Sequence, residues 1–446
     1  MASTRLTRTP SSVGNRQKWT WSGWLKQTNY GHDRAFFSVY VHANDKLQCY
    51  IDASDRVNIW FYNGTSYNIA TTRKLRDINA WYHIHIRVDT TQATANDRFR
   101  IYVNGSQETN LDTNNQPTQN LQMSVNQAQP HLISSDGQGN NHFDGVMSHI
   151  NFCDGQSLEP TEFGSTDATT GEWKIKTSPN VTYGTNGFFI LKDGNSLTDQ
   201  SGNSNNFTVD AGTLINTGDN PSNIFCTMNR LVNYQNGSPR FQKGNNNIDG
   251  TGTAWMRTVG TLGARTGKFY YEAQINTYYG SGRPIRLGWE SIDNINAGAT
   301  NYYSGLVITS DGNIYGGIRD NSSYDPNTSY GSSYGQGDII GLAIDLDNDT
   351  ISVYKNGTVF SNINGFSIAS NNNCSIKKSH GYQVSPSMNW YAVNYTDNKV
   401  TFNFGNGNFG DTQLTGTTYQ DSNGQGVFKY QPPTNYLAWC TKNFNV

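Results

Sequence analysis

The chain has 446 residues, of which only 15% are charged, and its formal net charge at pH 7 is −2. Average soluble proteins carry roughly 25% charged residues, and a chain this close to neutral exerts no long-range pull on nucleic acid or anionic membrane. No apolar run approaches the roughly 20 residues needed to cross a bilayer, and the N-terminal segment lacks the apolar core of a secretory signal. We therefore expect a soluble protein made in a cytosol, with no nucleic-acid partner and no membrane insertion.

Composition and turn chemistry both predict an all-β fold. Turn formers and strand formers, including 45 Gly and 26 Tyr, replace the Leu/Glu/Lys/Ala mixture of helical proteins. Three alternating runs, at residues 58–67, 99–107 and 351–360, each meet an Asn-Gly pair. Because Asn and Gly tolerate the positive φ angles of a type I′ turn, each run predicts a β-hairpin closed by that turn. No common period surrounds the three copies, so they are one reused turn and not a sequence repeat.

The first half of the chain contains a readable succession of strands between Lys18 and about Asp210. Apolar side chains alternate with polar ones along its clearest pair of strands, which predicts antiparallel sheets stacked as a sandwich with one face on the core and the other in solvent. The predicted core positions of this pair are Ile84, Ile86, Val88, Phe99, Ile101 and Val103, and the predicted solvent positions are His83, His85, Arg87, Arg98, Arg100 and Tyr102.

The chain divides near residue 215, and a second series of strands follows. A segment rich in Gly, Asn and Pro at 215–229 predicts a linker. Alternating runs then cover 266–275, 285–292, 303–318, 337–360 and 391–405. In the longest run, Leu342, Ile344 and Leu346 alternate inward before a turn and Ile351 and Val353 alternate inward after it, which predicts a second sandwich. The final aromatic segment, 411–446, is expected to lie back on a domain or on a neighbouring subunit.

Both halves resemble known families. Residues 5–27, 80–105, 143–164 and 183–208 resemble the laminin-G type of concanavalin-A-like jelly roll, in the version seen in virion proteins of marine bacteriophages. Residues 267–275, 287–291 and 337–357 resemble the SPRY domain, a single β-sandwich, and the C-terminal segment resembles that of the same phage proteins. The expected organisation is a basic arm (1–17), a laminin-G/concanavalin-A-like domain (18–214), a linker (215–229), a SPRY-like domain (230–410) and a tail (411–446).

Residues suited to catalysis or metal binding were sought along the whole chain. Glycoside hydrolases need two carboxylates flanking the scissile bond, and no such acidic arrangement occurs. The phrase Asp345-x-Asp347-x-Asp349 lacks the Gly and Glu that an EF-hand loop requires, so a plain turn explains it. His83 and His85 have a spacing that can ligate a metal, but no third ligand accompanies them, and a solvated strand face is the better interpretation. We expect no enzyme, no metal and no cofactor.

The five cysteines are far apart and form no metal motif. Their spacing shows neither a Cys-x-x-Cys pair nor a Cys/His cluster, so single buried thiols are expected. They are Cys49, Cys153, Cys226, Cys374 and Cys440.

Tyrosine-rich loops in the second half are the main candidates for ligand binding. Such loops share the adaptable composition of antibody binding loops, and aromatic rings can stack on sugar faces while Asn, Asp and Ser bind hydroxyl groups. Packing of these loops on each other or on a neighbouring subunit explains them equally well. The SPRY resemblance implies a partner-binding surface at one end of the sandwich. The candidate residues are Tyr324, Tyr330 and Tyr334, with Tyr278, Tyr279, Tyr302 and Tyr303 in adjacent loops.

A second, weaker candidate lies in the first half. Trp60 and Tyr62 lie on the strand face opposite Ile59 and Phe61. Upstream, Arg5, Arg8 and Arg16 alternate with small polar residues in the basic arm, which we expect to dock on an acidic groove of another virion protein and to stay outside the core.

Two functions remain open at this point. The first is a virion surface protein, a tail-fibre, tail-spike or head-fibre component whose lectin-like modules bind host cell-surface glycan. The alternative is a non-catalytic structural virion protein that decorates a capsid or joins subunits. Both place the protein in a virion assembled in the host cytoplasm, in several copies, with other virion proteins as partners and a homo-oligomer as one form of assembly.

Overall fold

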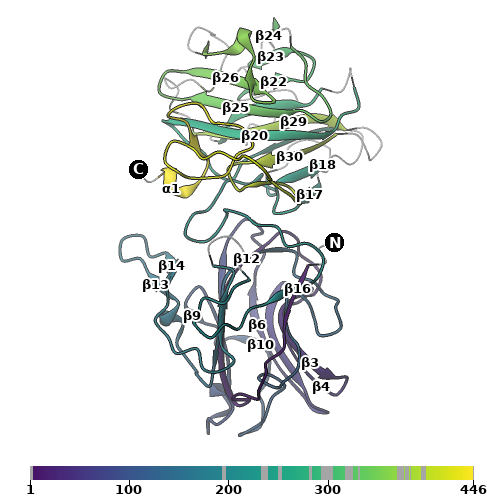
Figure 1. The fold of residues 1–446 in the computed structure, drawn as a ribbon, viewed down its shortest axis with the longest axis vertical. Coiled ribbons are helices and arrows are strands. Elements are labelled where there is room, and N and C mark those ends of the chain that lie inside the picture. Colours follow the sequence, from purple (N-terminus) through teal and green to yellow (C-terminus); the bar gives the residue numbers. More distant parts are fainter. Residues whose placement is uncertain are drawn as a thin grey trace. The chain divides into compact units, whose positions relative to one another are not determined.

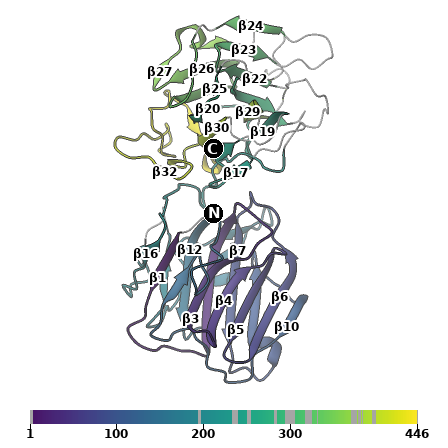
Figure 2. The same cartoon turned by 90° about the vertical axis from the view of Figure 1, so that its right-hand side faces the viewer.

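The computed structural model describes most of the chain and divides it into two compact units. The first unit comprises Met1–Ile215 and Asn220–Ser222, and the second comprises Asn216–Asp219 and Asn223–Val446. Figure 1 and Figure 2 show each unit as a packed set of strands. The described residues are 4–192, 197–232, 240–249, 254–280, 284–292, 305–316, 325–329, 332–368, 376, 381, 383–392 and 398–444.

An eight-stranded sheet forms one layer of the first unit in the described residues. All its neighbouring strands pair antiparallel. In order across the sheet, the strands are β10 (Leu111–Asn115), β6 (Ser66–Lys74), β5 (Arg56–Tyr62), β4 (Asp45–Ile51), β3 (Arg34–His42), β11 (His131–Ile133), β1 (Arg5–Arg8) and β16 (Thr208–Ala211).

A six-stranded antiparallel sheet forms the other layer. A separate small hairpin, β13 (Gly164–Thr166) with β14 (Trp173–Ile175), follows it in the chain, and the 3-10 helices are η1 (Ala95–Asp97) and η2 (Pro160–Glu162). The strands of the six-stranded sheet are β15 (Phe188–Ile190), β12 (Gly145–Asp154), β2 (Lys18–Gln27), β7 (Tyr82–Asp89), β8 (Phe99–Val103) and β9 (Ser106–Gln107).

The core of the first unit lies between these two sheets. Apolar side chains at alternate positions meet there, as period-two patterning dictates. Phe37 of β3 lies against Phe152 of β12, with ring centroids 5.7 Å apart. The six predicted core positions on β7 and β8 are all buried: Ile84, Ile86, Val88, Phe99, Ile101 and Val103.

The second unit repeats this two-layer design with different strands. One described sheet has nine strands: β17 (Arg240–Gln242), β18 (Asn247–Asp249), β30 (Lys399–Asn403), β20 (Lys268–Thr277), β25 (Ile339–Asp345), β26 (Thr350–Lys355) and β27 (Thr358–Val359), with β28 (Phe366–Ser367) on β26 and β33 (Leu437–Ala438) on β20. The other described sheet has six: β19 (Ala254–Val259), β29 (Val384–Ala392), β21 (Arg286–Ser291), β22 (Gly305–Thr309), β23 (Asn313–Gly316) and β24 (Asp325–Ser329). Smaller elements are η4 (Ser361–Ile363), β31 (Asn408–Phe409), β32 (Thr412–Gln413) and α1 (Thr441–Phe444).

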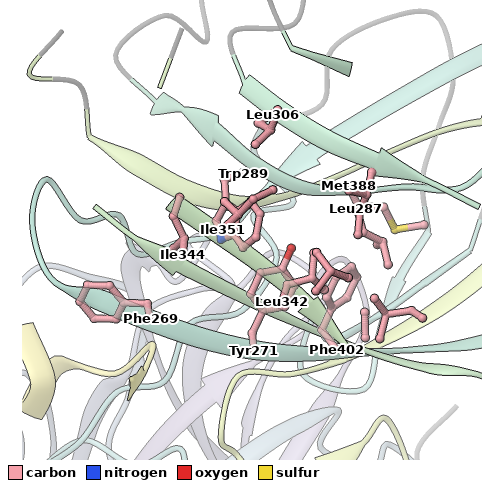
Figure 3. Packing of buried hydrophobic residues seen from close by; sticks show 14 of the residues in the cluster. Phe269, Tyr271, Leu287, Trp289, Leu306, Leu342, Ile344, Ile351, Met388 and Phe402 are labelled. Atoms are coloured by element: carbon pink, nitrogen blue, oxygen red, sulfur yellow. The ribbon is translucent and has the colours of Figure 1, made fainter. Parts of the chain in front are cut away.

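The second core is as continuous as the first. Tyr271 of β20 lies edge-on to Trp289 of β21, with ring centroids 6.1 Å apart, and donates its hydroxyl hydrogen to the carbonyl of Gly288. Figure 3 shows these rings among aliphatic side chains from both sheets. The predicted inward positions Leu342, Ile344, Leu346, Ile351 and Val353 are all buried. The prediction of an all-β fold with two antiparallel sandwiches is therefore confirmed.

The three Asn-Gly hairpins are confirmed, but they do not share one turn. Residues 104–105 and 356–357 are two-residue turns with positive φ at both positions, as a type I′ turn requires. At the first copy, Tyr62 pairs with Ser66, which leaves a three-residue loop, and of its Asn-Gly pair only Gly64 has positive φ. The prediction of a type I′ turn there is wrong, because the extra Thr65 lengthens the loop.

Aspartates organise many of the long loops. In three turns the Oδ1 atom of one Asp accepts the backbone N–H groups two and four residues later, at 2.7–3.0 Å. Such side chains replace backbone partners that a sheet would supply. The residues are Asp52, Asp136 and Asp421. Asp345 acts similarly on the N–H groups of Asp347 and Asn348, so the predicted plain turn after β25 is confirmed.

The segments expected to lie outside the sandwiches belong to them. Leu6 of β1 is buried, and β1 pairs with β11 on one side and β16 on the other, so residues 5–8 are a sheet strand and the expected detached arm is a wrong prediction there. Within the expected linker, Phe225, Cys226 and Met228 are buried in the second unit. Each of these segments carries one or more apolar residues whose burial outweighs its polar, turn-rich composition.

The C-terminal segment lies back on the second sandwich. Trp439 is fully buried, with its ring centroid 4.6 Å from that of Phe269. The carboxylate of Glu272 in β20 accepts the backbone N–H groups of Lys429 and Tyr430 at 2.9 and 2.8 Å. Burial raises the pKa of Glu272 to about 7, against the opposing effect of these hydrogen bonds.

Candidate functional site

The candidate site lies on the outer side of the eight-stranded sheet. Alternation along β5 sends Ile59 and Phe61 into the core, where both are fully buried, and sends Trp60 and Tyr62 to the opposite side, where both are half-buried. Figure 2 shows β3, β4, β5, β6 and β10 side by side in this sheet. The predicted orientation of Trp60 and Tyr62 is confirmed.

The two aromatic rings form an ordered pair. Their centroids lie 6.1 Å apart and their planes differ by only 17°. The indole N–H of Trp60 donates to Ser66 Oγ at 2.9 Å, which fixes the ring orientation. Residues two apart on one strand share a face, so the pair presents a nearly continuous aromatic surface along β5.

Polar side chains from the two flanking strands surround this pair. Strand register sets Gln48 and Asn68 on either side of Trp60, and Lys46 and Ser66 on either side of Tyr62. The Asn68 Oδ1 atom is buried and has no hydrogen-bond partner among the described residues. We call these six residues the open face: Lys46, Gln48, Trp60, Tyr62, Ser66 and Asn68.

One cation belongs to the open face. The Lys46 ammonium lies 5.1 Å from the centroid of the Trp60 ring, within the range of a cation–π contact. Farther along β5, Arg56 is bound to Asp52 and Asp112. Burial raises the pKa of Asp52, but hydrogen bonds from the backbone and side chain of Arg56 outweigh this effect and hold that pKa below its ordinary value.

The outer side of the six-stranded sheet is covered. We call Ser22, Trp24, His83, His85 and Tyr102 the covered face, and each of them is buried. The expectation that His83 and His85 lie in solvent is therefore wrong. Residues that follow β12 in the chain pack over them, including Phe163, whose ring centroid lies 5.6 Å from that of His85, and Trp173.

Hydrogen bonds define the tautomer of His83. The indole N–H of Trp173 donates to His83 Nδ1 at 3.0 Å, so Nδ1 carries no hydrogen and the Nε2–H donates to Ser22 Oγ at 2.8 Å. Burial lowers the pKa of His83 well below its ordinary value, and the neighbouring His85 lowers it further. Burial also lowers the pKa of His85 to about 3. Both rings are neutral parts of a packed layer.

Among the described residues, no group of three His, Cys, Asp or Glu side chains has an arrangement that could hold a metal ion. His83 and His85 illustrate this, because three of their four ring nitrogens face Ser22, Trp173 and the carbonyl of Leu158, and the fourth, His85 Nδ1, is buried. Cys49, Cys153, Cys226 and Cys440 are buried thiols that form no disulfide among the described residues, whereas Cys374 lies outside the described residues.

The structure brings together few of the tyrosines predicted to bind a ligand. Tyr334 is 2% exposed, and its hydroxyl lies 2.9 Å from both the Ile285 and the Ile308 carbonyl oxygens, so it is a core residue and the prediction for it is wrong. Tyr278 is half-buried, and Tyr279 is 60% exposed. The remaining four predictions fall outside the described residues: Tyr302, Tyr303, Tyr324 and Tyr330.

The arginines predicted to dock on a partner are engaged within the first unit. Arg5 donates through Nε to Asp210 at 2.6 Å, Arg8 donates to Asn205, and Arg16 donates to the carbonyl of Met123 at 2.6 Å. Burial lowers the pKa of Arg8, and Asp199 opposes that shift. The docking hypothesis therefore loses its structural basis, because these side chains hold the edge of their own sandwich.

Sequence reasoning found the aromatic pair of the open face but missed its polar neighbours. Lys46, Gln48 and Asn68 become visible only when the register between β4, β5 and β6 is known. One signal was present in the sequence: Leu47, Cys49 and Ile51 are apolar at alternate positions, which places Lys46 and Gln48 on the same side as Trp60 once β4 and β5 form a hairpin.

The two units match two family models. Residues 2–162 match the model described as the concanavalin A-like lectin/glucanases superfamily, of the laminin-G type, and residues 268–374 match the SPRY domain. The two matches support an architecture in which a laminin-G/concanavalin-A-like domain precedes a SPRY domain. This domain order agrees with the one that the sequence resemblance implied, and the fold class is that of two antiparallel β-sandwiches.

Solved structures give distant matches. The SPRY domain of human HERC1 is 14% identical, with 40% of this chain and 94% of that chain covered at a TM-score of 0.28. The Ruminococcus gnavus IT-sialidase CBM40 is 13% identical, with 35% of this chain and 91% of that chain covered at a TM-score of 0.26. Domains LG4-5 of the mouse laminin alpha1 chain are 10% identical, with 98% of this chain and 94% of that chain covered at a TM-score of 0.31. None of the curated proteins compared with the chain matches it. No helix in the described parts of the chain is long and apolar enough to cross a membrane.

Proposed function

We propose that the protein is a non-catalytic carbohydrate-binding protein whose open face attaches to cell-surface polysaccharide. The observation that carries this proposal is the ordered pair of Trp60 and Tyr62 on the outer side of the eight-stranded sheet. Aromatic rings of this kind offer a flat apolar surface to the C–H face of a sugar ring.

Polar groups beside the aromatic pair fit the rest of a sugar. Gln48 forms no side-chain hydrogen bond within the described residues, and Asn68 Oδ1 is likewise unpartnered. Amide groups offer both donors and acceptors, which suits hydroxyl groups that do both. An apolar ligand would leave the half-buried amide of Gln48 desolvated without a partner, at a cost of roughly 1–3 kcal/mol. The combination of a stacking surface with this amide therefore favours a sugar.

The proposed setting is the surface of a bacteriophage virion. Its support is the resemblance of residues 5–27, 80–105, 143–164 and 183–208 to virion proteins of marine phages. A single stacking site binds a sugar weakly, and many copies on one particle raise the effective affinity without any new contact. The protein would then be a tail-fibre, tail-spike or head-fibre component with other virion proteins as partners. A decoration protein that binds no sugar is the competing outcome.

The absence of catalysis is part of the proposal. It rests on the lack of a flanking carboxylate pair in the sequence, which glycoside hydrolysis requires. Incubating the protein with each polysaccharide that it retains should release no reducing ends above the buffer blank. Release that disappears on mutating an acidic residue would overturn this part.

Substitution of the aromatic pair tests the binding site. Full-length protein would be passed over immobilised bacterial polysaccharides, both neutral and acidic. We expect Trp60→Ala and Tyr62→Ala each to weaken retention by about 5- to 100-fold, because aromatic anchors contribute roughly 1–3 kcal/mol each. Tyr279→Ala is the matched control, since Tyr279 is an exposed aromatic residue of the other unit. Retention that survives both open-face substitutions, or no retention of wild type at all, would contradict the proposal.

A further inference from the structure

We propose that the open face selects acidic sugars, that is, pyranose rings carrying a carboxylate or sulfate, through the ammonium group of Lys46. This inference rests on the proposed function, since it names the class of sugar that the same site takes. Three features carry it: the position of Lys46, the charge balance around it, and the unpartnered polar atoms beside it.

Position comes first. In the register of β4 and β5, Lys46 lies opposite Tyr62, and its ammonium lies 5.1 Å from the Trp60 centroid. The lysine therefore spans the aromatic pair from Tyr62 to Trp60. A sugar ring seated on either aromatic side chain would bring its substituents next to this ammonium, which ends a flexible four-carbon stem and can turn to meet them.

Charge balance comes second. Among the described residues, Lys46 has no carboxylate within the 4.0 Å of an ion pair. Asp45 precedes Lys46 in β4, but its carboxylate accepts hydrogen bonds from Ser124 and Gln127, and alternation directs it to the other side of the strand. The six residues of the open face therefore carry one positive charge and no negative one.

The unpartnered amides supply the third feature. Asn68 Oδ1 is buried beside Trp60 and accepts no hydrogen bond within the described residues, while Gln48 lies on the other side of the same indole. The half-buried Gln48 can bind a hydroxyl of a ring whose anionic substituent is held by Lys46, and a small shift of the Asn68 side chain would let its Oδ1 accept a second one. A second copy of this face would bring two unneutralised ammonium groups together, so charge complementarity favours an acidic polysaccharide over self-association.

Paired ligands separate the acidic group from the sugar ring. Oligogalacturonate would be compared with its fully methyl-esterified form, and a sulfated galactan oligomer with its desulfated form, by titration into full-length protein. We expect the charged member of at least one pair to bind more tightly. Lys46→Met should then reduce that preference by roughly two- to fivefold, the range of a solvent-exposed ion pair. Lys46→Arg should retain it, and the preference should shrink as salt increases.

A matched control removes the same charge elsewhere on the sheet. Lys74 is exposed in β6, outside the open face, so Lys74→Met changes the net charge equally and should leave the preference intact. A preference confined to the uronate pair or to the sulfate pair identifies which anion is recognised, and either supports the proposal.

The outcomes distinguish failure of the acidic-sugar inference from failure of the proposed function. Equal binding of charged and neutral members, or a preference that Lys46→Met does not change, overturns the acidic-sugar inference while the proposed function stands. Loss of preference in Lys74→Met as well as in Lys46→Met also overturns it, because net charge and not the open face would then be responsible. If no member of either pair and no immobilised polysaccharide binds, the proposed function itself fails and the inference fails with it.

Discussion

The two outer surfaces of the first sandwich have the same alternating pattern in the sequence but different surroundings in the structure. Along β5, Trp60 and Tyr62 alternate with core residues; along β7, His83 and His85 do the same. The first pair lies on the open face beside free amides and an unneutralised lysine. The second pair lies on the covered face, beneath residues that follow β12, with ring nitrogens bound to Ser22, Trp173 and a backbone carbonyl.

This difference shows that alternation along a strand predicts which side of the sheet a side chain lies on, but not what surrounds it there. A strand presents every second residue away from the core whether water, a ligand or another part of the chain lies there. The covered face is buried because a downstream segment packs over it, and Trp173 of that segment, 90 residues after His83, fits against two glycines. A Cβ atom at Gly105 or Gly164 would approach the Trp173 ring to 2.4 or 2.6 Å, so only glycine leaves room for the indole.

Acidification should damage the covered face most. The pKa values of His83 and His85 are lowered in the folded protein, so below pH about 6.5 the unfolded chain takes up protons that the folded chain does not. The contribution of these two histidines to the stability of the first sandwich is therefore complete well above that pH and is lost as the pH decreases through it. Between pH 6.5 and 5 the expected loss from His85 is about 2 kcal/mol, and His83 lowers the stability in the same direction.

Amide hydrogen exchange of the full chain, measured at each pH, would report the loss of stability of the first unit. The groups facing His83 are His85, Ser22, Trp24, Trp173 and the side chain of Asn104, none of them a carboxylate. His85→Gln should reduce the slope of unfolding free energy against pH by about 1.4 kcal/mol per pH unit over this range. An unchanged slope would mean that the covered face hydrates readily and resembles the open face after all.

Truncating a tryptophan should destabilise the protein more on the covered face than on the open face. Trp173→Ala should lower the free energy of unfolding of the first sandwich by about 2 kcal/mol, less than a core Trp because Trp173 is half-buried. Trp60→Ala should cost no more than about 1 kcal/mol, since it removes one exposed hydrogen bond and a surface cation–π contact. Urea unfolding of the two variants measures both losses of unfolding free energy. Equal losses would contradict the distinction between the open face and the covered face.

Two serines provide the smallest and most closely matched contrast. Ser22 accepts a hydrogen from buried His83, and Ser66 accepts one from Trp60. Ser22→Ala leaves a buried donor without a partner and should cost about 1 kcal/mol, whereas water can replace the hydroxyl in Ser66→Ala, which should cost less than about 0.5 kcal/mol. The same urea titration resolves them, and a larger cost at Ser66 would contradict the account.

Much of the fold could be predicted from sequence because it depends on local patterns. Alternation identified the core positions of β7, β8, β25 and β26, and turn residues located the hairpins. The peripheral segments could not be predicted this way. Composition marked residues 215–229 as a linker, yet Met228 lies in the main core of the second unit and Phe225 in a smaller apolar cluster of the same unit. Burial of an isolated apolar residue depends on a distant surface that the local pattern does not contain.

The candidate site was only half predictable for the same reason. Trp60 and Tyr62 follow from alternation alone, while Lys46 and Asn68 reach the site from neighbouring strands through register. Tyr334 was misjudged because a tyrosine among Ser and Gly has the composition of a binding loop, although its hydroxyl finds backbone carbonyls inside the sandwich. Amino-acid composition indicates that a segment forms a loop, but it does not predict whether a tyrosine ring in that loop points outward or into the core.

Fluorine NMR of the wild-type chain labelled with 5-fluorotryptophan tests most directly the claim that the open face, and not the covered face, meets the ligand. The chain has 10 tryptophans, and Trp60→Phe and Trp173→Phe assign the two signals that matter. Titration with a polysaccharide fragment that the protein retains should shift the Trp60 resonance in a saturable way and leave the Trp173 resonance in place. A shift of Trp173 with Trp60 unmoved would contradict the account.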